Sequence, residues 1–475
     1  MRSALPGSVR RLSLVLVLSA TADAFSLVAL LWYLTVSRAG AGALGALVLV
    51  AGLPAIASGP LIGRFLERAP ARPLLAADNL ARAAILITIT GLAAAGELSL
   101  PVLFALVGLT GLLSPVTYAG SRVLLPQLVS DAQLVAANRL LAVGDQFPLL
   151  AGPAAAGVTA SALGGPAALV IPAAGLISAG WAAWRLPAAP ARRVSEAGGP
   201  SEPGGARGRG AARGPGGWRT PAVQAVLALT GAYFLAYGPL EPAMPLYAHR
   251  TLHAGAAGYG ALWSVFGAGA LVGLLAVRPL ARLRPGLVNA GGAAVWGLVT
   301  LPLVFVSALP AALAVMFVGG LIWGPYGAIE VMTIQAATPR RRHGTVFGVR
   351  RAIQVAATPA GAAAGGLLLT RLGPQAVIGV AAGACILAGA AGLLYPPLRR
   401  LPRPPAAPAR PATGAAWFGR SRRGQARPHA DRVQAGHRGL RPRRAHPAGN
   451  AGRAGRLRLR RDERPLPPVA GGAGP

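Results

Sequence analysis

Residues 12–35 read LSLVLVLSATADAFSLVALLWYLT, a run of about 24 residues in which Asp23 is the one charged side chain. A helix of about 20 predominantly apolar residues is long enough to cross a bilayer. A cleavable signal peptide has a shorter apolar core and a small-residue cleavage site, and this run has neither feature. The stretch therefore predicts a first membrane-spanning helix that the protein retains.

The rest of the chain supports the same interpretation. Of its 475 residues, 53% are hydrophobic and only 12% are charged. A soluble domain carries about 25% charged residues, so this composition excludes an ordinary soluble enzyme. Eleven more apolar runs follow the first, at residues 42–62, 73–95, 98–119, 141–162, 166–184, 223–247, 259–277, 287–306, 309–333, 352–369 and 377–395. We therefore expect an all-α polytopic membrane protein with twelve transmembrane helices.

Two segments without apolar runs divide the chain. Residues 185–220 are rich in Gly, Pro, Arg and Ala, which predicts a flexible cytoplasmic linker between six helices and six. Residues 396–475 have a similar composition and predict a disordered cytoplasmic tail. GC-rich DNA that is read out of frame gives the same mixture, so an extension without function is the alternative for this tail. The expected bundles are residues 1–184 and 221–395.

The charge is strongly positive, with 46 basic and 13 acidic residues giving +33. About half of this surplus belongs to the tail, which has 19 arginines and three acidic residues. If the helices alternate in direction, 23 of the other 27 arginines fall on one side of the membrane and three on the other. By the positive-inside rule, both termini are then cytoplasmic in a plasma-membrane protein. Since this arrangement accounts for the charge, no nucleic-acid partner is expected.

The two halves also share short segments in the same order. Residues 38–47 read RAGAGALGAL and residues 253–262 read HAGAAGYGAL, each just before the second helix of its half. GPAAAG at 152–157 and TPAGAAAG at 358–365 occupy the fifth helix of each half. The matching order predicts two pseudo-symmetric six-helix bundles. Such repeats place a substrate site between the halves, near the middle of the membrane.

A charged segment follows the second predicted helix, where residues 63–72 read GRFLERAPAR. Gly63, Glu67, Arg68 and Arg72 have the spacing of G-x-x-x-D-R-x-x-x-R, with Glu in place of the usual Asp. The segment resembles the signature loop of the major facilitator superfamily, which controls conformational switching in that family. The resemblance implies the superfamily's fold of two helical bundles. The alternative is a cytoplasmic loop that only follows the positive-inside rule.

Other segments resemble the macrolide-efflux-like branch of drug:proton antiporters. They lie at residues 78–82, 121–129, 136–138, 238–241, 335–339 and 344–348. Gly152, Pro153 and Gly157 also resemble part of the antiporter helix motif G-P-x-x-G-G, although Pro148 and Ala156 replace two of its glycines. Generic helix packing is the alternative for this motif. The arginine motif of many proton antiporters is absent from the fourth predicted helix, which weakens the case for proton coupling.

Charged side chains inside the apolar runs are the strongest pointers to function, because a charge at mid-bilayer costs roughly 2.5–3.5 kcal/mol. Asp23 and Glu241 lie in the first helix of each half, and we expect one or both to line a central cavity and to exchange protons or bind a cationic substrate. Structural pairing or capping is the alternative. Asp78 and Arg82, four residues apart, are expected to form a structural ion pair. Trp323 is a candidate to line the cavity, and a lipid-facing or packed tryptophan is the alternative.

The expected function is secondary active transport, with proton-coupled efflux of drug-like or small amphipathic compounds by alternating access. The sequence has no nucleotide-binding loop and no metal-ligand cluster, so we expect a monomeric transporter without cofactor or metal rather than an enzyme. Its expected partners are the lipid bilayer, a small-molecule substrate and protons. The alternatives are a metabolite importer or facilitator, a membrane sensor or scaffold, and an anionic-lipid or nucleic-acid binder acting through its tail. Glu330, near a helix end, is expected to be solvated at the membrane interface.

Overall fold

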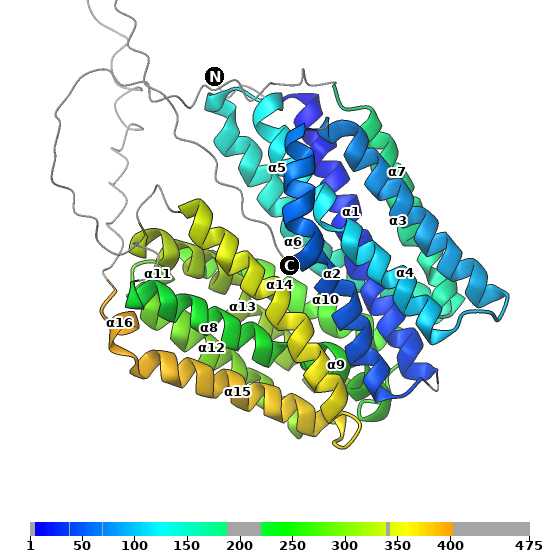
Figure 1. Cartoon of the computed structure of the whole chain (residues 1–475). Helices are drawn as coiled ribbons and strands as arrows, with labels where there is room; N and C mark the ends of the chain where they lie inside the picture. The colour runs from blue at the N-terminus through cyan, green and yellow to red at the C-terminus, as the bar shows by residue number, and fades with distance from the viewer. Residues whose placement is uncertain (1–4, 38, 69, 188–219, 339–342, 402–475) are drawn as a thin grey trace, which may run out of the picture. The chain divides into compact units, whose positions relative to one another are not determined.

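The structure is a computed structural model in which every regular element of the described residues is a helix (Figure 1). The described residues are 5–37, 39–68, 70–187, 220–338 and 343–401. Within the helices, the side chains of residues 59–61, 63–68, 131–132, 134–135, 138–139, 142–143, 145–146, 336 and 343–345 are also outside the description. Most of the predicted linker and tail lies outside the described residues. The all-α prediction is confirmed for the part of the chain that is described.

The first half of the chain forms one group of helices, which Figure 1 draws in blue to teal. Its elements are α1 (Gly7–Val36), α2 (Ala41–Arg68), α3 (Ala71–Ala94), α4 (Leu100–Leu113), α5 (Pro115–Leu128), α6 (Asp131–Leu163), the 3-10 helix η1 (Pro166–Leu169) and α7 (Val170–Trp184). Helices α4 and α5 follow each other directly and together span Leu100–Leu128. Helix α6 ends at Leu163 because Gly164 has φ +78°, a left-handed conformation that favours glycine.

The second half forms a second group, drawn in green to orange in Figure 1. Its elements are α8 (Pro221–Tyr237), α9 (Leu240–Arg250), α10 (Ala256–Gly273), η2 (Leu274–Ala276), α11 (Val277–Leu280), α12 (Pro285–Thr300), η3 (Leu301–Val304), α13 (Leu309–Ala337), α14 (His343–Leu368), α15 (Pro374–Leu394) and α16 (Pro396–Arg399). Proline stands in the first turn of α8, α12, α13 and α15, where its missing N–H leaves no helical hydrogen bond unmade.

Among the described residues, ten helical segments are long and apolar enough to cross a membrane. The predicted fifth span corresponds to the shorter apolar segment Phe147–Leu163 within α6. The predicted eleventh span corresponds to α14, whose first half carries Arg350 and Arg351 and is therefore less apolar. The protein is a polytopic helical membrane protein, as its composition predicts.

Several helices are longer than hydropathy predicts. Helix α2 continues through Arg68, so Gly63, Glu67 and Arg68 belong to the end of a helix and not to a loop. Helix α5 continues to Leu128, and α6 begins at Asp131 after a capping box on Ser130. Charged and polar residues end an apolar run without ending a helix, which explains the difference.

Glycines allow the two groups of helices to approach closely at two crossings. Helix α2 packs along α14, and α6 packs along α10. A methyl group added to Gly45 would lie 2.7 Å from Cα of Gly366, and one added to Gly157 would lie 2.9 Å from Cα of Gly260. Real side-chain carbons do not approach so closely, so both crossings require glycine. The pairs join the second helix of each half to the fifth helix of the other, as a repeat related by pseudo-symmetry requires.

Candidate functional site

A cavity of about 830 Å³ lies between the two groups of helices. Its walls come from α1, α2, α3, α4, α5 and α7 of the first group and from α8, α13 and α14 of the second. Cavities of about 300–1,000 Å³ are typical of small-molecule sites. Among the described residues, its wall includes five that carry charge, namely Asp23, Arg82, Glu330, Arg350 and Arg351.

The first buried ion-pair network of the cavity is centred on Arg82 of α3. Its Nη2 pairs with Oδ1 of Asp23 on α1, while Nη1 donates a hydrogen bond to Ser19 Oγ at 3.1 Å. The same Nη1 lies 3.6 Å from Oδ2 of Asp78, one turn earlier on α3. The side chain of Asp23 is 49% exposed, whereas those of Arg82 and Asp78 are 2% and 1% exposed. The guanidinium of Arg82 thus connects two carboxylates. That of Asp23 is open to the cavity, and that of Asp78 is buried behind it.

The buried carboxylate of Asp78 is supported by α5. Thr117 Oγ1 donates to Asp78 Oδ2 at 2.5 Å and accepts a hydrogen bond from Asn79 Nδ2 at 2.8 Å. Within the described residues, Oδ1 of Asp78 has no hydrogen-bond partner. An ionised carboxylate oxygen in such a place is costly to bury, and a proton on the carboxyl group removes that charge.

A second ion pair lies in the other group of helices. Glu330 of α13 is fully buried, and its Oε2 pairs with Nη2 of Arg350 on α14. Its Oε1 accepts a hydrogen bond from Thr230 on α8. Glu330 therefore ties three helices together beneath the cavity wall. The expectation that it is solvated at the membrane interface is wrong, because α13 continues to Ala337 and places it inside the bundle.

Replacing Thr230 with valine is expected to lower the free energy of unfolding by about 1–2 kcal/mol, because the buried carboxylate of Glu330 loses a hydrogen-bond donor. Thermal unfolding of the purified protein in detergent measures this loss. The matched control is Thr333→Val, since the hydroxyl of this equally buried threonine donates only to the carbonyl of Ile329 in its own helix. Equal losses in both variants would contradict a specific role for the hydrogen bond between Thr230 and Glu330.

Aromatic side chains line the cavity beside these charges. Trp323 and Tyr326 of α13 and Phe234 of α8 form part of its wall. Tyr118 of α5 is 46% exposed, and the Arg351 guanidinium carbon lies 5.6 Å from its ring centroid. This cation–π contact joins the two groups of helices across the cavity.

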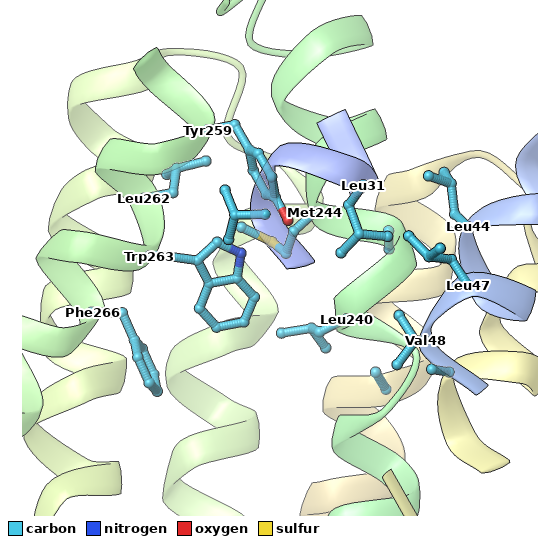
Figure 2. Close-up of a cluster of buried hydrophobic side chains, with 14 of the residues drawn as sticks. Leu31, Leu44, Leu47, Val48, Leu240, Met244, Tyr259, Leu262, Trp263 and Phe266 are labelled. Atoms are coloured by element: carbon cyan, nitrogen blue, oxygen red, sulfur yellow. The ribbon is translucent and has the colours of Figure 1, made fainter. Parts of the chain in front are cut away.

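An apolar seal closes one end of the space between the two groups, where α1 ends and α2 begins. Figure 2 shows Leu31, Leu44 and Leu47 of the first group meeting Leu240 and Tyr259 of the second in one buried cluster.

Trp32 adds aromatic contacts to this seal, stacking on Tyr259 with 6.1 Å between ring centroids and meeting His249 edge-on at 5.7 Å. Contacts of this kind are worth about 0.5–1.5 kcal/mol beyond the burial of area, so they help to hold this end shut.

A cavity between two groups of helices in one membrane chain is typical of a carrier protein. Comparison with known proteins identifies the family of carriers. Residues 12–358 match the Major Facilitator Superfamily family model. The chain belongs to the major facilitator superfamily. It is therefore a membrane transporter rather than an enzyme, and it acts on a small molecule within a lipid bilayer.

The superfamily assignment is supported by an MFS-type transporter, y4rN, of Sinorhizobium fredii. It is 27% identical over 359 residues, covering 74% of this chain and 86% of that protein. A bacterial homologue of the iron transporter ferroportin in an inward-facing state has a TM-score of 0.61 at 16% identity, covering 82% of this chain and 99% of the other. The nucleoside transporter NupG gives a TM-score of 0.59 at 12% identity, covering 82% of this chain and 98% of the other. At such identities the two structures support the fold and say nothing of the cargo.

The candidate residues of this superfamily transporter are distributed unevenly around its cavity. Asp23 and Trp323 line it, and Asp78 with Arg82 extends the network behind Asp23. Glu241 is not among the described lining residues, so of the two acids of which one or both are expected in the cavity, Asp23 alone lines it. It lies in the first turn of α9 and accepts a hydrogen bond from Tyr237 at 3.0 Å. This contact and the positive end of the helix dipole stabilise Glu241 locally.

The antiporter-like motif of α6 lies where three helices meet. A methyl group on Gly152 would lie 2.7 Å from Cβ of Ala24, next to Asp23 on α1. Gly157 faces α10 of the other group, and the carbonyl of Pro153 approaches Gly260 at the same crossing. The motif therefore allows α6 to contact both its own bundle and the opposite one.

The switch segment is described only in part. The side chains of Gly63, Glu67 and Arg68 lie outside the described residues. The guanidinium carbon of Arg72 lies 5.2 Å from the ring centroid of Trp184 on α7, a contact that fixes the start of α3 against the end of α7. The role of these four residues in conformational switching stays a prediction.

Proposed function

We propose that the chain is a secondary active transporter that exports small amphipathic organic compounds in exchange for protons. One observation carries the proposal: Asp23 is open to a cavity of substrate size and is joined through Arg82 to a second, buried carboxylate. The network contains two acids, Asp23 and Asp78, and one base, Arg82. When all three groups are ionised, the network carries one net negative charge. A proton on either carboxyl group neutralises the network and leaves Arg82 paired with the other.

The proposed transport cycle follows from this arrangement. A proton that binds Asp23 weakens its hold on Arg82, which can then pair with Asp78 alone. The positive-inside distribution of arginines supports a cytoplasmic N-terminus. With that orientation, the seal of Leu31, Leu44, Leu47, Leu240 and Tyr259 lies on the outer side. The cavity then faces the cytoplasm, where an exporter loads its substrate. The bundles at residues 1–184 and 221–395 rock about the cavity, connected by the cytoplasmic linker 185–220.

The choice of an organic substrate rests on the lining of the cavity. Trp323 and Phe234, which are partly exposed, offer aromatic surface on which a drug-like or amphipathic molecule can stack. Within the described residues, no group of three His, Cys, Asp or Glu side chains could hold a metal ion.

Asp23→Asn is expected to uncouple transport from the proton gradient. Everted membrane vesicles with the full chain would be loaded with a panel of fluorescent amphipathic compounds, with and without an ionophore that collapses the gradient. We expect at least a tenfold loss of gradient-driven uptake in Asp23→Asn and in Asp78→Asn, since each variant fixes the network in its neutral form.

The matched control is Glu97→Gln, an exposed carboxylate in the connection between α3 and α4. Uptake by the unaltered protein that survives collapse of the proton gradient would contradict proton coupling. Gradient-driven uptake at the normal rate in both aspartate variants would contradict the assignment of the coupling site.

A further inference from the structure

The charges of the cavity differ in how far they are open to a ligand. The side chains of Arg82 and Glu330 are 2% and 0% exposed, and that of Arg350 is 16% exposed. Asp23, at 49%, and Arg351 are the exposed charged residues of the described cavity wall. A molecule in the cavity therefore meets one accessible carboxylate and one accessible guanidinium.

These two charges come from opposite groups of helices. Asp23 lies on α1 of the first group and Arg351 on α14 of the second. Arg351 follows Arg350 directly, and successive residues of a helix point in different directions. Arg350 turns to the buried Glu330, while Arg351 faces the cavity and the ring of Tyr118.

The surrounding networks leave a surplus of opposite sign on each side. On the first side, Asp23 and Asp78 share the single base Arg82, which leaves one negative charge when both acids are ionised. On the second side, Glu330 is matched by Arg350, which leaves the positive charge of Arg351. In a low-dielectric site, complementary charges on a ligand decide which molecule is selected.

We propose that the cavity selects amphipathic zwitterions, with a cationic group at Asp23, an anionic group at Arg351 and an aromatic body along Trp323 and Phe234. The Arg351 guanidinium carbon lies 5.6 Å from the ring centroid of Tyr118, and a guanidinium can bind a carboxylate through two parallel hydrogen bonds. The proposal rests on the proposed transport function and names its substrate class. A purely cationic ligand leaves Arg351 without an anion, and a purely anionic ligand leaves Asp23 without a cation.

Ligands that differ only in charge test this selection. The purified full-length protein in detergent would be titrated, without any gradient, with ciprofloxacin as a zwitterion, with its ethyl ester as a cation and with its N-acetyl form as an anion. A second set is phenylalanyl-phenylalanine with its methyl ester and its N-acetyl form. We expect the zwitterion of each set to bind about tenfold more tightly, or better, than either partner.

Two variants assign the ends of the ligand. Arg351→Gln is expected to abolish the preference for the zwitterion over the ester, and Asp23→Asn is expected to abolish its preference over the N-acetyl form. Arg371→Gln, which changes an exposed arginine between α14 and α15, should leave both preferences unchanged. Each variant thus removes one preference and keeps the other, which a general loss of folding does not do.

The proposal is overturned if the ester or the N-acetyl form binds as tightly as the zwitterion, or if neither zwitterion binds. These titrations measure affinity at equilibrium and do not depend on a proton gradient. Loss of proton coupling with an intact zwitterion preference would therefore overturn the proposed exchange mechanism alone. Proton-driven uptake with no zwitterion preference would overturn the substrate class alone.

Discussion

Replacing Arg82 with methionine is expected to abolish transport and to lower the free energy of unfolding by about 3–5 kcal/mol. Arg82 is almost fully buried and is the base that faces both Asp23 and Asp78. Methionine fills a similar volume but leaves two carboxylates close together without a positive charge. Loss of one partner of a buried ion pair is costly because the remaining charge stays away from water.

The cause of this loss can be separated from a general packing defect. Adding Asp78→Asn to Arg82→Met removes the more buried carboxylate and is expected to restore part of the stability, because only Asp23, which reaches the cavity, remains charged. Arg82→Lys keeps the charge, but one ammonium cannot reproduce the contacts of Nη1 with Ser19 and Asp78 and of Nη2 with Asp23. We expect intermediate stability and little transport from it.

Thermal unfolding in detergent and uptake into everted vesicles measure the two effects of Arg82→Met. Arg371→Met is the matched control, since Arg371 is exposed at a helix connection. The interpretation fails if Arg82→Met unfolds at the temperature of the control and still transports. It also fails if the double variant with Asp78→Asn is less stable than Arg82→Met alone.

The sequence predicts the helices and individual charges of this site better than their connections. Asp23 is visible as an acid in an apolar run, and Asp78 and Arg82 as a pair one helical turn apart. Arg82 joins Asp23 to Asp78 only because α1 and α3 pack against each other. No periodicity within either helix predicts that contact. The glycine at position 152, which brings α6 next to α1, is an indirect signal of close packing around Asp23.

The pair of Glu330 and Arg350 escapes sequence reasoning for a different reason. Hydropathy places the end of one helix at residue 333 and the start of the next at residue 352, which puts both residues near the membrane interface. In the structure α13 continues to Ala337 and α14 already begins at His343. Glu330 and Arg350 neutralise each other, so the two helices can keep both charges inside the membrane. A hydropathy scale scores each residue separately and cannot detect this pairing.

Glu241 shows the limit of reasoning from the internal repeat. It lies in the helix that corresponds to the helix of Asp23, but α8 ends at Tyr237 and a new helix starts at Leu240. The break at Gly238 and Pro239 separates Glu241 from the straight part of the helix. The equivalence of the two halves therefore holds for their helix crossings better than for their charges.

Those crossings lead to the second large effect: Gly157→Val is expected to arrest transport while leaving the protein folded. At Gly157 even a methyl group would lie 2.8 Å from the carbonyl oxygen of Ala256 on the opposite bundle. The larger valine therefore forces α6 and α10 apart, and the sealed end of the cavity opens. Gly45→Val should act in the same way at the symmetry-related crossing of α2 and α14.

Spin labels can report this opening directly because Cys385, the chain's one cysteine, is buried and can be replaced by alanine. Labels at Glu97→Cys and Arg371→Cys stand on exposed connections of the two bundles at the sealed end. Gly157→Val should lengthen the distance between the labels and reduce uptake at least tenfold, because a carrier held open on one side cannot complete alternating access.

The control for both readouts is Gly175→Val in α7, where an added methyl group would have no atom of another described helix within 4 Å. It places the same side chain in a helix of the same bundle, away from the crossing. Unchanged label distance and uptake in Gly157→Val would show that the glycine crossings do not hold the closed end. Because Gly157 is not among the residues that line the cavity, ligand affinity should persist in this variant even as transport stops.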